Sequence, residues 1–416
     1  MENPLRRTLW SLKRRVERSV AKRSYARSTP LVKNRISNQL LNEVPIKVHF
    51  LLSQPELWWA NDFYELLEGS PHFLPNIIVF PDHESHLNPA ESMQRNMEFA
   101  HQISANVTSG WMQMVRSPEE LGVTDSLIFV QQPNMGLAPK WTLKSLIRTN
   151  LVCYVPYGLK VSVHDFSHFN LPFHKYCWKI FAESAWHQAQ FYEQGQFDAE
   201  RIACVGYPKF DGFKSLEASV SKKTEEFNII IAPHWSHGDD YLGYATFELY
   251  FEYWKQLTTT YPEIFWVLKP HPRLAQRLIE TKFFSERECD AYFDWWTKQP
   301  NTTLVTGGNY LSWFVKSSAM LTDCGSFIAE YLPTLKPLLI LKRTGSAGFN
   351  AFGRMIAETF WLATSEVEID RFVRDVVRGG NDEKYESRRM LRTDLGFDTD
   401  FNASKMIHDT LLESLS

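Results

Sequence analysis

Cysteine is scarce in this chain, and the few cysteines lie far apart. The 416 residues contain no Cys-x-x-Cys pair and only five cysteines, Cys153, Cys177, Cys204, Cys289 and Cys324. A disulfide framework needs an even set of cysteines, and a structural zinc site needs paired ones. The sequence therefore argues against both, and we expect a protein of a reducing compartment.

Long apolar runs are missing as well. No run approaches the roughly 18 residues that span a bilayer, and the first residues lack the apolar core of a secretory signal. We therefore expect a cytoplasmic protein. Hydrophobic residues still make up 44% of the chain and aromatic residues 14%, which is typical of a folded globular protein.

Charge is distributed unevenly although the net charge is only -3. The first 35 residues hold eleven Lys or Arg and two acids, whereas the remainder holds 34 basic and 46 acidic residues. Leu5, Leu9, Leu12, Val16 and Val20 recur at spacings of three and four, which predicts a basic amphipathic helix. Such a helix can lie as a peripheral anchor on the anionic inner face of a membrane. A solvated basic tail and an oligomer contact are the alternatives; nucleic acid is not expected as a partner, because the body is acidic.

Short apolar runs that end in Pro, Gly or Ser alternate with helical stretches along the rest of the chain. This alternation predicts an α/β fold whose strands deliver loops to one sheet edge. The runs fall into two series, 46–52, 76–81, 126–133, 151–158, 179–184 and 201–208, then 228–235, 265–268, 302–308, 318–326 and 337–343. The polar stretch 212–226 between the series reads as a linker, so two α/β halves should face each other across a cleft.

The stretch "FWVLKPHPRL" carries the first candidate site. An apolar run ends there in Lys269, His271 and Arg273, separated by prolines that cannot extend a strand. Ligands of open α/β sheets bind at this carboxyl edge. We therefore expect two positive charges and a titratable imidazole, which suit a nucleotide diphosphate; the alternative is a structural histidine held by a backbone carbonyl.

The stretch "SAMLTDCGSFIAEYL" is the second. The pattern predicts a strand ending in Thr322 and Asp323, a tight turn at Gly325 and Ser326, and a helix that carries Glu330 one turn later. Free N–H groups at a helix start, with a hydroxyl beside them, suit a phosphate, and a carboxylate one turn on can accept hydrogen bonds from ribose hydroxyls. The bland alternative is a capping serine and a solvated glutamate.

Further candidates are weaker. In "APHWSHGDD", Pro233 and His234 are expected to line the donor side, and His237 with the following acids only superficially resembles a metal site. In the first half, Tyr157 and Gly158 end a strand and Lys209 follows another, so we place these three on the acceptor side. Three histidines follow Tyr157, namely His164, His168 and His174, and His164 and His168 are candidate bases for an acceptor hydroxyl, although all three can equally be packing residues.

Taken together, these motifs resemble the CDP-glycerol glycerophosphotransferases and related bacterial wall and capsule transferases of the GT-B fold. The matching stretches, in the family's order, are "VGYPKFD" (205–211), "IIIAPHW" (229–235), "LKPHP" (268–272) and "NYLSWFVKSSAMLTDCGSFIAEYLPTLKPLLIL" (309–341). They cover roughly residues 150 to 345. Two positions depart from the family pattern: Tyr157 stands where the family has a histidine base, and Cys324-Gly325-Ser326 replaces Tyr-Ser-Ser.

The resemblance implies two Rossmann-like domains and the transfer of a glycerophosphate-type or sugar unit from a cytidine nucleotide to a hydroxyl of a lipid-linked or oligosaccharide acceptor. It implies a place in the synthesis of capsule, teichoic-acid-like polymer or lipopolysaccharide. His271 would assist at the diphosphate and Ser326 would hold phosphate. The CDP-linked donor is a substrate rather than a cofactor, no resident cofactor is implied, and metal dependence stays open because Asp323 can recruit an ion.

We accordingly divide the chain into five parts: a basic N-terminal segment (1–44), an acceptor domain (45–211), a linker (212–226), a nucleotide-donor domain (227–385) and C-terminal helices (386–416). Two other functions remain open. One is a glycosyltransferase that uses another nucleotide sugar, and the other is a catalytically inactive nucleotide-binding scaffold, which the missing histidine at Tyr157 favours.

Overall fold

The computed structural model describes residues 4–82, 87–110, 116–133, 135, 137–163, 168–219, 227–238, 242–307, 310–397 and 402–416. Side chains are described from residue 13 onward, apart from those of residues 139, 214, 215, 218 and 219. The chain forms two compact units. Unit 1 comprises Met1–Gly158, Asp165–Asp211 and Phe401–Ser416, and unit 2 comprises Leu159–His164 and Gly212–Asp400.

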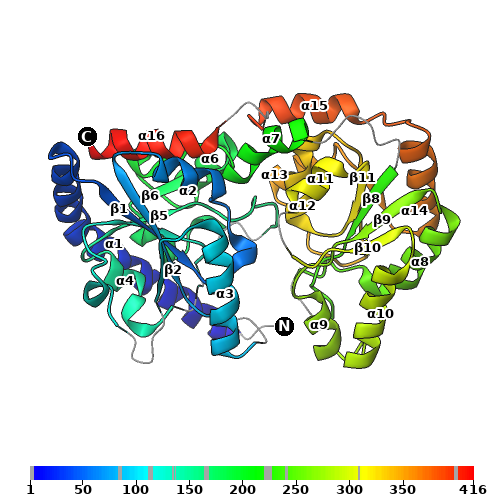
Figure 1. Cartoon of the computed structure of the whole chain (residues 1–416), viewed down its shortest axis with the longest axis horizontal. Helices are drawn as coiled ribbons and strands as arrows, with labels where there is room; N and C mark the ends of the chain where they lie inside the picture. The colour runs from blue at the N-terminus through cyan, green and yellow to red at the C-terminus, as the bar shows by residue number, and fades with distance from the viewer. Residues whose placement is uncertain are drawn as a thin grey trace. The chain divides into compact units, whose positions relative to one another are not determined.

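Unit 1 is built on a seven-stranded parallel sheet with the order β3-β2-β1-β4-β5-β6-β7 (Figure 1). The strands are β1 (Ile46–Leu52), β2 (Phe73–Val79), β3 (Val107–Ser109), β4 (Leu127–Val130), β5 (Leu151–Tyr154), β6 (Lys179–Ala182) and β7 (Ile202–Cys204). The α-helices are α1 (Pro4–Leu41), α2 (Asn61–Glu68), α3 (Pro89–Ile103), α4 (Leu143–Leu146), α6 (Ala185–Glu193) and α16 (Ala403–Leu415). Short 3-10 turns include η4 (Phe173–Tyr176) and η6 (Pro208–Phe210).

Unit 2 is built on a six-stranded parallel sheet with the order β10-β9-β8-β11-β12-β13. The strands are β8 (Phe227–Ala232), β9 (Ile264–Leu268), β10 (Thr302–Leu304), β11 (Ala319–Thr322), β12 (Leu338–Leu341) and β13 (Trp361–Ala363). The α-helices are α8 (Phe247–Thr260), α9 (Leu274–Glu280), α10 (Glu286–Lys298), α11 (Leu311–Lys316), α12 (Gly325–Tyr331), α13 (Ala351–Ala357), α14 (Glu366–Arg371) and α15 (Tyr385–Asp394), and a π-helix (Phe372–Arg378) follows α14.

Both sheets follow the same winding, in which the first strand lies between the second and the fourth. The chain order reverses between β1 and β4 in unit 1 and between β8 and β11 in unit 2. The central strands β4, β5, β11 and β12 are buried along their whole length, as expected for parallel strands covered on both faces. The prediction of two Rossmann-like α/β domains is therefore confirmed. Sequence analysis missed the short edge strands β3 and β13, which lack long apolar runs.

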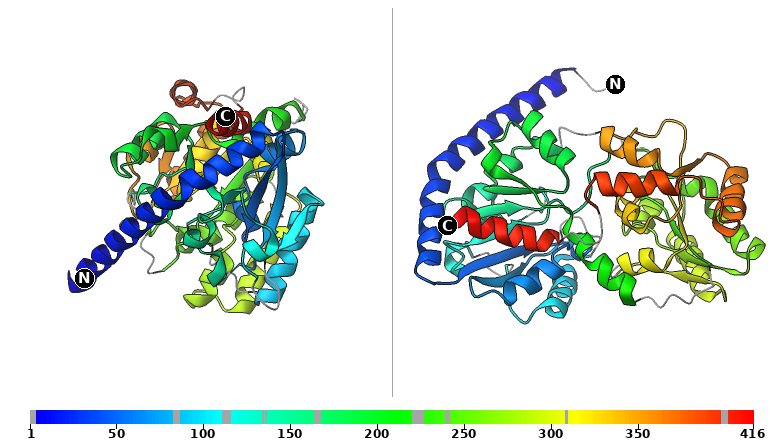
Figure 2. Two further views of the ribbon diagram at one scale, coloured as in Figure 1. Left: turned by 90° about the vertical axis from the view of Figure 1, so that its left-hand side faces the viewer. Right: turned by 90° about the horizontal axis from the view of Figure 1, so that it is seen from above.

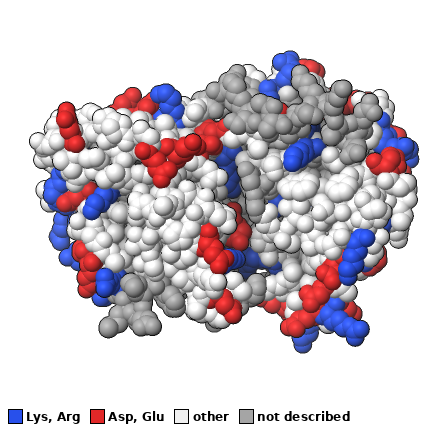
Figure 3. Space-filling view, viewed as in Figure 1, with Lys and Arg blue, Asp and Glu red and all other residues white. Residues whose placement is uncertain are grey.

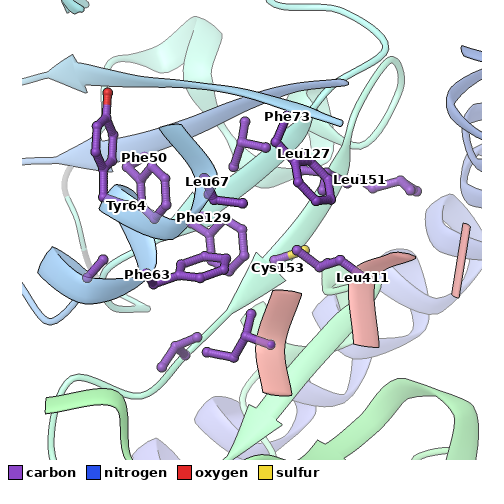
Figure 4. Packing of buried hydrophobic residues seen from close by; sticks show 14 of the residues in the cluster. Phe50, Phe63, Tyr64, Leu67, Phe73, Leu127, Phe129, Leu151, Cys153 and Leu411 are labelled. Atoms are coloured by element: carbon purple, nitrogen blue, oxygen red, sulfur yellow. The ribbon is translucent and has the colours of Figure 1, made fainter. Parts of the chain in front are cut away.

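The core of unit 1 shows how the alternation along β1 fills both faces of the sheet. Phe50 packs into an aromatic cluster in which its ring stacks on Phe129 at 5.1 Å and meets Phe63 edge-on at 5.9 Å (Figure 4). Leu51, the next residue, belongs to the cluster on the other face. Leu411 of α16 joins the Phe50 cluster, with Ile407 and Leu415 of the same helix. Each of these buried side chains contributes about 1.5–3 kcal/mol, which attaches the C-terminal helix to unit 1.

Helix α1 is longer than the predicted basic helix, and the face that it buries differs from the expected one. Val32 and Ile36, in its second half, are fully buried in the core of unit 1, whereas Val16 is 55% exposed. The helix also contacts η4 and α16, and the C-terminal end of α16 lies beside it in both views of Figure 2. The expected stripe therefore fails at Val16, because the sheet of unit 1 covers the later part of the helix; the side chains of residues 4–12 lie outside the described part.

The expected linker is partly helical. Helix α7 spans Asp211–Ser219 and buries Phe213, because Phe213 and Leu216 recur at helical spacing within the polar stretch. Asp211 accepts hydrogen bonds from the backbone N–H groups of Ala403 (2.8 Å) and Ser404 (2.7 Å) and so caps α16. The C-terminal region consequently divides between the units, with α15 in unit 2 and α16 in unit 1.

Surface charge and helix hydropathy give two further observations. On the face drawn in Figure 3, the described Lys and Arg side chains stand among Asp and Glu side chains. No helix in the described part of the chain combines the length and apolarity needed to cross a membrane.

Candidate functional site

The candidate site lies at the carboxyl ends of three adjacent strands of unit 2. Strand β8 pairs with β9 on one side and with β11 on the other, so the loops after these strands share one sheet edge (Figure 1). That edge includes the reversal point between β8 and β11, where open α/β sheets bind ligands. The loops bring together Pro233 and His234 after β8, the Lys269–Arg273 turn after β9, and the Asp323–Ser326 turn after β11.

Asp323 joins two of these loops. Its Oδ1 accepts the backbone N–H of His234 at 2.5 Å, and its Oδ2 accepts both the backbone N–H of Thr246 and the Thr246 hydroxyl, the latter at 2.9 Å. Burial raises the pKa of the Asp323 carboxyl to about 7, and the hydrogen bonds from Thr246 and His234 oppose that rise. We expected Asp323 to bind donor or recruit an ion, but protein donors already occupy both oxygens, so the contacts give it a positioning role.

Thr322 makes a similar connection one residue earlier. Its hydroxyl donates to the carbonyl oxygen of Ala232 at 2.7 Å and accepts the backbone N–H of Cys324 at 2.9 Å. The side chain is fully buried. Thr322 therefore holds the start of the β11–α12 turn against the end of β8, and its contacts are those of a structural residue.

His234 is buried, and its hydrogen bonds define its tautomer. Ser236 Oγ accepts the backbone N–H groups of Tyr244 (3.0 Å) and Ala245 (3.2 Å), so its own hydrogen is directed to His234 Nδ1, 2.8 Å away. The backbone N–H of Ser236 also donates to Nδ1. In the neutral ring the hydrogen therefore sits on Nε2. Burial, with Arg273 second, lowers the pKa of His234 to about 3, so the imidazole is neutral at physiological pH.

His271 has a matching arrangement on the neighbouring loop. Its backbone N–H donates to the carbonyl oxygen of Pro233 at 3.0 Å, and its Nδ1 accepts the backbone N–H of Arg273 at 3.2 Å. The two imidazole rings of His271 and His234 lie 5.6 Å apart. Burial holds the pKa of His271 well below its usual value, and His234, Lys269 and Arg273 add to this effect. The two neutral imidazoles thus lie side by side. In each ring Nδ1 accepts a hydrogen bond, so the ring hydrogen is on Nε2 and Nε2–H is the donor.

Two cations flank the histidine pair. The Lys269 side chain is buried with its Nζ 5.3 Å from the centre of the Tyr310 ring and 5.5 Å from that of Phe327. Arg273 is exposed, and its guanidinium lies over the Trp235 ring at 4.3 Å. Contact with the faces of aromatic rings orients both cations.

Glu330 differs from its expected role. Only 3% of it is exposed, and its Oε2 accepts a hydrogen bond from the Tyr310 hydroxyl. Burial and the adjacent carboxylate raise the pKa of Tyr310 well above its usual value, so the phenol remains the donor. We expected a carboxylate that accepts ribose hydroxyls; in the structure it accepts the hydroxyl of the half-buried Tyr310.

Helix α12 begins at Gly325, so Gly325 and Ser326 are its first two residues rather than the expected tight turn before it, and the glycine has a packing explanation. A Cβ at position 325 would lie 3.2 Å from Val161 Cγ2 and 3.5 Å from the Tyr244 ring. The space that a side chain at position 325 would need is therefore occupied by Val161 and Tyr244, which explains the glycine by packing. Ser326 is half-buried, with its Oγ 3.7 Å from Cys324 Sγ.

The acceptor-side candidates lie in unit 1. The carbonyl oxygen of Tyr157 accepts the hydroxyl of the buried Tyr207 at 2.6 Å, which ties the ends of β5 and β7 together next to Gly158. Gly206 has a φ of 83°, so the turn before Lys209 requires glycine. Lys209 lies with its Nζ 6.0 Å from the centre of the Tyr207 ring.

The three expected histidines have different outcomes. His164 lies outside the described residues. His168 is half-buried with its ring edge-on to Phe169. His174 is fully buried, its Nδ1 accepts the backbone N–H of Leu171 at 3.1 Å, and its ring packs against Tyr154; it is a packing residue.

Sequence analysis missed a polar network at the carboxyl edge of unit 1. Gln131 Oε1 accepts the backbone N–H groups of Ser53 (2.8 Å) and Gln54 (3.1 Å), and Asn96 Nδ2 donates to the carbonyl oxygens of Ser53 (2.7 Å) and Phe80 (2.8 Å). These buried amides join the ends of β1, β2 and β4. The signal in the sequence is a polar residue directly after each apolar run, as in "FLLSQ" and "IFVQQ".

The described residues include no group of three or more His, Cys, Asp or Glu side chains placed to hold a metal ion. The acids that follow His237 in the sequence, Asp239 and Asp240, lie outside the described part. His237 itself is engaged by Thr281 Oγ1, 2.9 Å from its Nδ1. The described chemistry of the site is therefore that of imidazole, ammonium, guanidinium and hydroxyl donors, a set that suits a phosphorylated ligand.

Comparison with known proteins places the fold. No protein-family model matches the chain, and no curated protein matches it. Among solved structures, the wall teichoic acid polymerase TagF, as a variant, aligns with a TM-score of 0.58 and 13% identity over 96% of this chain and 98% of that chain. UDP-GlcNAc 2-epimerase from Neisseria meningitidis, bound to UDP-GlcNAc, aligns with a TM-score of 0.55 and 17% identity over 88% of this chain and all of that chain.

A third structure, that of S. aureus MnaA with UDP, aligns with a TM-score of 0.55 and 16% identity over 89% of this chain and 97% of that chain. At such identities the similarity concerns the fold, and it extends over nearly the whole chain in each case. The shared architecture consists of two parallel, Rossmann-like sheets. This chain therefore has the GT-B fold.

Proposed function

We propose that this protein is a GT-B transferase of bacterial surface-polysaccharide synthesis. It moves a glycerophosphate-type or sugar unit from a cytidine nucleotide to a hydroxyl of a lipid-linked or oligosaccharide acceptor. Unit 2 binds the donor and unit 1 the acceptor. The observation that carries the proposal is the pair of neutral imidazoles, His234 and His271, held 5.6 Å apart between Lys269 and Arg273 at the reversal point of a Rossmann-like sheet.

The charge on this edge favours a diphosphate. Lys269 and Arg273 attract the anion, and the Nε2–H groups of His234 and His271 donate hydrogen bonds to its oxygens. In the free protein, burial and neighbouring cations keep the pKa of His271 low. A bound diphosphate supplies negative charge that raises this pKa, so His271 can stabilise the leaving phosphate as charge develops on it.

For a CDP-alditol donor, the acceptor oxygen forms a new bond to the phosphorus that carries the alditol. The bond between that phosphorus and the bridging oxygen breaks, and CMP leaves with the bridging oxygen and its electron pair. The proton of the acceptor hydroxyl passes to a base, for which His168 is the described candidate in unit 1. The similarity to TagF, one structure of which was determined after a soak with CDPG, supports this donor class.

The identity of the released nucleotide tests the proposal. The purified protein is incubated with CDP-glycerol, CDP-ribitol, CMP-sugars and UDP-GlcNAc, and the released nucleotides are separated by chromatography. Release of CMP from a CDP-alditol is the expected result. Release of nothing from any cytidine donor, although CDP or CMP binds, contradicts the proposal and favours a nucleotide-binding scaffold.

A second candidate function is an enzyme that acts on another nucleotide sugar. The observation that favours it is the similarity to UDP-GlcNAc 2-epimerase bound to UDP-GlcNAc, which covers all of that chain. In that case the bond at the sugar carbon breaks, and UDP rather than CMP is released. The same chromatographic assay separates the two functions.

A further inference from the structure

A cavity lies in unit 1, away from the sheet edge that carries the candidate acceptor residues. Its volume is about 360 Å³, and α1, the starts of β6 and β7, and the end of α16 enclose it. The residues that matter most for its chemistry are Tyr25, Thr29, Lys33, Lys179, Arg201 and Ser414. Figure 2 shows the end of α16 beside α1 at this side of unit 1.

The position of the cavity separates it from the candidate acceptor residues. Lys179 is the first residue of β6, and Arg201 directly precedes β7, so both lie at the amino ends of their strands. Tyr157, Gly158 and Lys209 lie after strands, at the carboxyl ends. Because all pairings of the sheet are parallel, these are opposite edges, and a ligand in the cavity is a different molecule, or a different part of one, from that at the carboxyl edge.

Arg201 is the most constrained cation of the cavity. It is 8% exposed, its Nη2 donates to the carbonyl oxygens of His174 (3.3 Å) and Lys175 (3.2 Å) and also of Cys177, and its guanidinium stacks on Tyr25 at 3.9 Å. Its Nε–H is buried and has no hydrogen-bond partner within the described residues. A buried, unsatisfied donor on a cation costs free energy, and an anion in the adjoining cavity would reduce that cost.

The other charged residues that line the cavity are Lys33, Lys179, Glu200 and Glu413. Lys179 is buried, with 9% exposed, and its Nζ donates to the carbonyl oxygen of Glu200, whereas Lys33 and both acids are exposed and screened by water. Burial lowers the pKa of Lys179, and the like charge of Lys33 lowers it further. Burial also lowers the pKa of Arg201. The buried charged side chains that line the cavity, Lys179 and Arg201, are therefore both cationic.

We propose that this cavity binds a phosphate group, either as a soluble phosphate ester or as the headgroup of an anionic phospholipid. Lys33, Lys179 and Arg201 provide the charge, and the hydroxyls of Thr29 and Ser414 provide neutral hydrogen-bonding groups for the remaining oxygens. The volume accommodates a phosphate together with a small alcohol such as glycerol.

The experiment uses the full chain and three variants. Lys33→Glu reverses the exposed cation of the cavity, and Ser414→Trp fills the cavity without changing charge. Arg27→Glu is the matched control, since Arg27 is exposed on the same helix and does not line the cavity. Circular dichroism establishes that each variant is folded. The probes are inorganic phosphate and glycerol 3-phosphate, followed by calorimetry, and vesicles of phosphatidylglycerol or phosphatidylcholine, followed by co-sedimentation.

The expected result is that Lys33→Glu and Ser414→Trp each weaken binding at least about tenfold, while Arg27→Glu changes it less than about twofold. This pattern with the soluble probes identifies a soluble phosphate ester, and the same pattern only with phosphatidylglycerol vesicles identifies a lipid headgroup. Phosphate bound at unit 2 is common to all variants and cancels in the comparison. Equal effects of Lys33→Glu and Arg27→Glu, or binding that Ser414→Trp leaves unchanged, overturn the proposal.

Discussion

The backbone N–H of His234 donates to Asp323 Oδ1 at 2.5 Å, and this one bond joins the loop after β8 to the turn after β11. Asp323 therefore sets the position of an imidazole without touching its ring. Both oxygens of the carboxylate accept backbone N–H groups, one from His234 and one from Thr246. In an asparagine at this position, the side-chain NH₂ group would face one of these N–H groups and could not accept its hydrogen bond.

We predict that Asp323→Asn lowers the free energy of unfolding by about 1–3 kcal/mol, the cost of an unsatisfied buried donor. The loss should depend on pH. The pKa of Asp323 is raised to about 7 in the folded state from 3.8, so the folded protein binds a proton more readily than the unfolded chain, and the stability contributed by Asp323 decreases as pH rises from about 4 to about 7.

The measurement is urea unfolding of both proteins between pH 4.5 and 8. The stability advantage of the wild-type protein over Asp323→Asn should shrink with rising pH, by at most roughly 1.4 kcal/mol per pH unit. The contributions of His234 and His271 are common to both proteins and cancel. An advantage that grows with pH in this window contradicts the raised pKa.

His271→Ala tests the imidazole pair under the proposed function. Removal of a positioned proton or hydrogen-bond donor at a leaving phosphate should lower kcat by roughly 100-fold or more. Nucleotide affinity should change much less, because Lys269 and Arg273 remain. His101→Ala, at an exposed position in α3, is the control. Turnover of His271→Ala within threefold of the wild-type value removes this residue from the mechanism.

Tyr310→Phe tests the hydrogen bond from Tyr310 to the buried carboxylate of Glu330. The loss of the hydroxyl leaves a buried carboxylate short of a donor, which should cost about 1–3 kcal/mol of stability. Because Lys269 lies over the ring of Tyr310, which this hydrogen bond holds in place, donor affinity should also fall. Tyr331→Phe is the control: Tyr331 is fully buried, whereas Tyr310 is half-buried, and the Tyr331 hydroxyl bonds to the Ser317 hydroxyl at 2.7 Å.

Thermal unfolding and donor KM are measured for both tyrosine variants. We expect both variants to lose similar stability and only Tyr310→Phe to show a raised donor KM. A raised KM in both variants would mean that the effect comes from general loosening of α12 rather than from Glu330.

Gly325→Ala tests whether packing explains this glycine. The added Cβ would meet Val161 at 3.2 Å, and overpacking of this kind costs about 1–3 kcal/mol. Gly307→Ala is the control, since nothing within 4 Å would meet its Cβ. Both variants are compared by thermal unfolding. Equal melting temperatures for Gly325→Ala and the wild-type protein would leave room beside Gly325 and restore the interpretation as a phosphate cradle.

The candidate edge of unit 2 was predictable because each of its loops directly follows an apolar run. The KPHP, TDCGS and APHW stretches each contain residues that end a strand. Because the strands are parallel, their carboxyl ends lie at one edge of the sheet, and so do these three stretches. The partners of the side chains were not predictable. Asp323, Glu330 and Gly325 were interpreted as ligand groups, but their contacts are Thr246, Tyr310 and Val161, which are at least 20 residues away in the sequence.

The division into units shows the same limit. Residues 212–226 look like a linker by composition, yet Phe213 gives the first part of the stretch a buried face in α7. The return of α16 to unit 1 depends on Asp211, which caps it from nearly 200 residues earlier in the chain.

By itself the sequence determined the local elements and their type: two series of strands, their common parallel direction, the basic helix at the start, and the polar turns that end strands. These follow from periodicity and turn residues, which act within a few positions. Only the tertiary structure decided which polar groups are available to a ligand at the sheet edge and which form hydrogen bonds with other groups of the protein. The free energy of a buried carboxylate, imidazole or guanidinium depends on donors and charges that distant segments bring to it, and no local pattern specifies those partners.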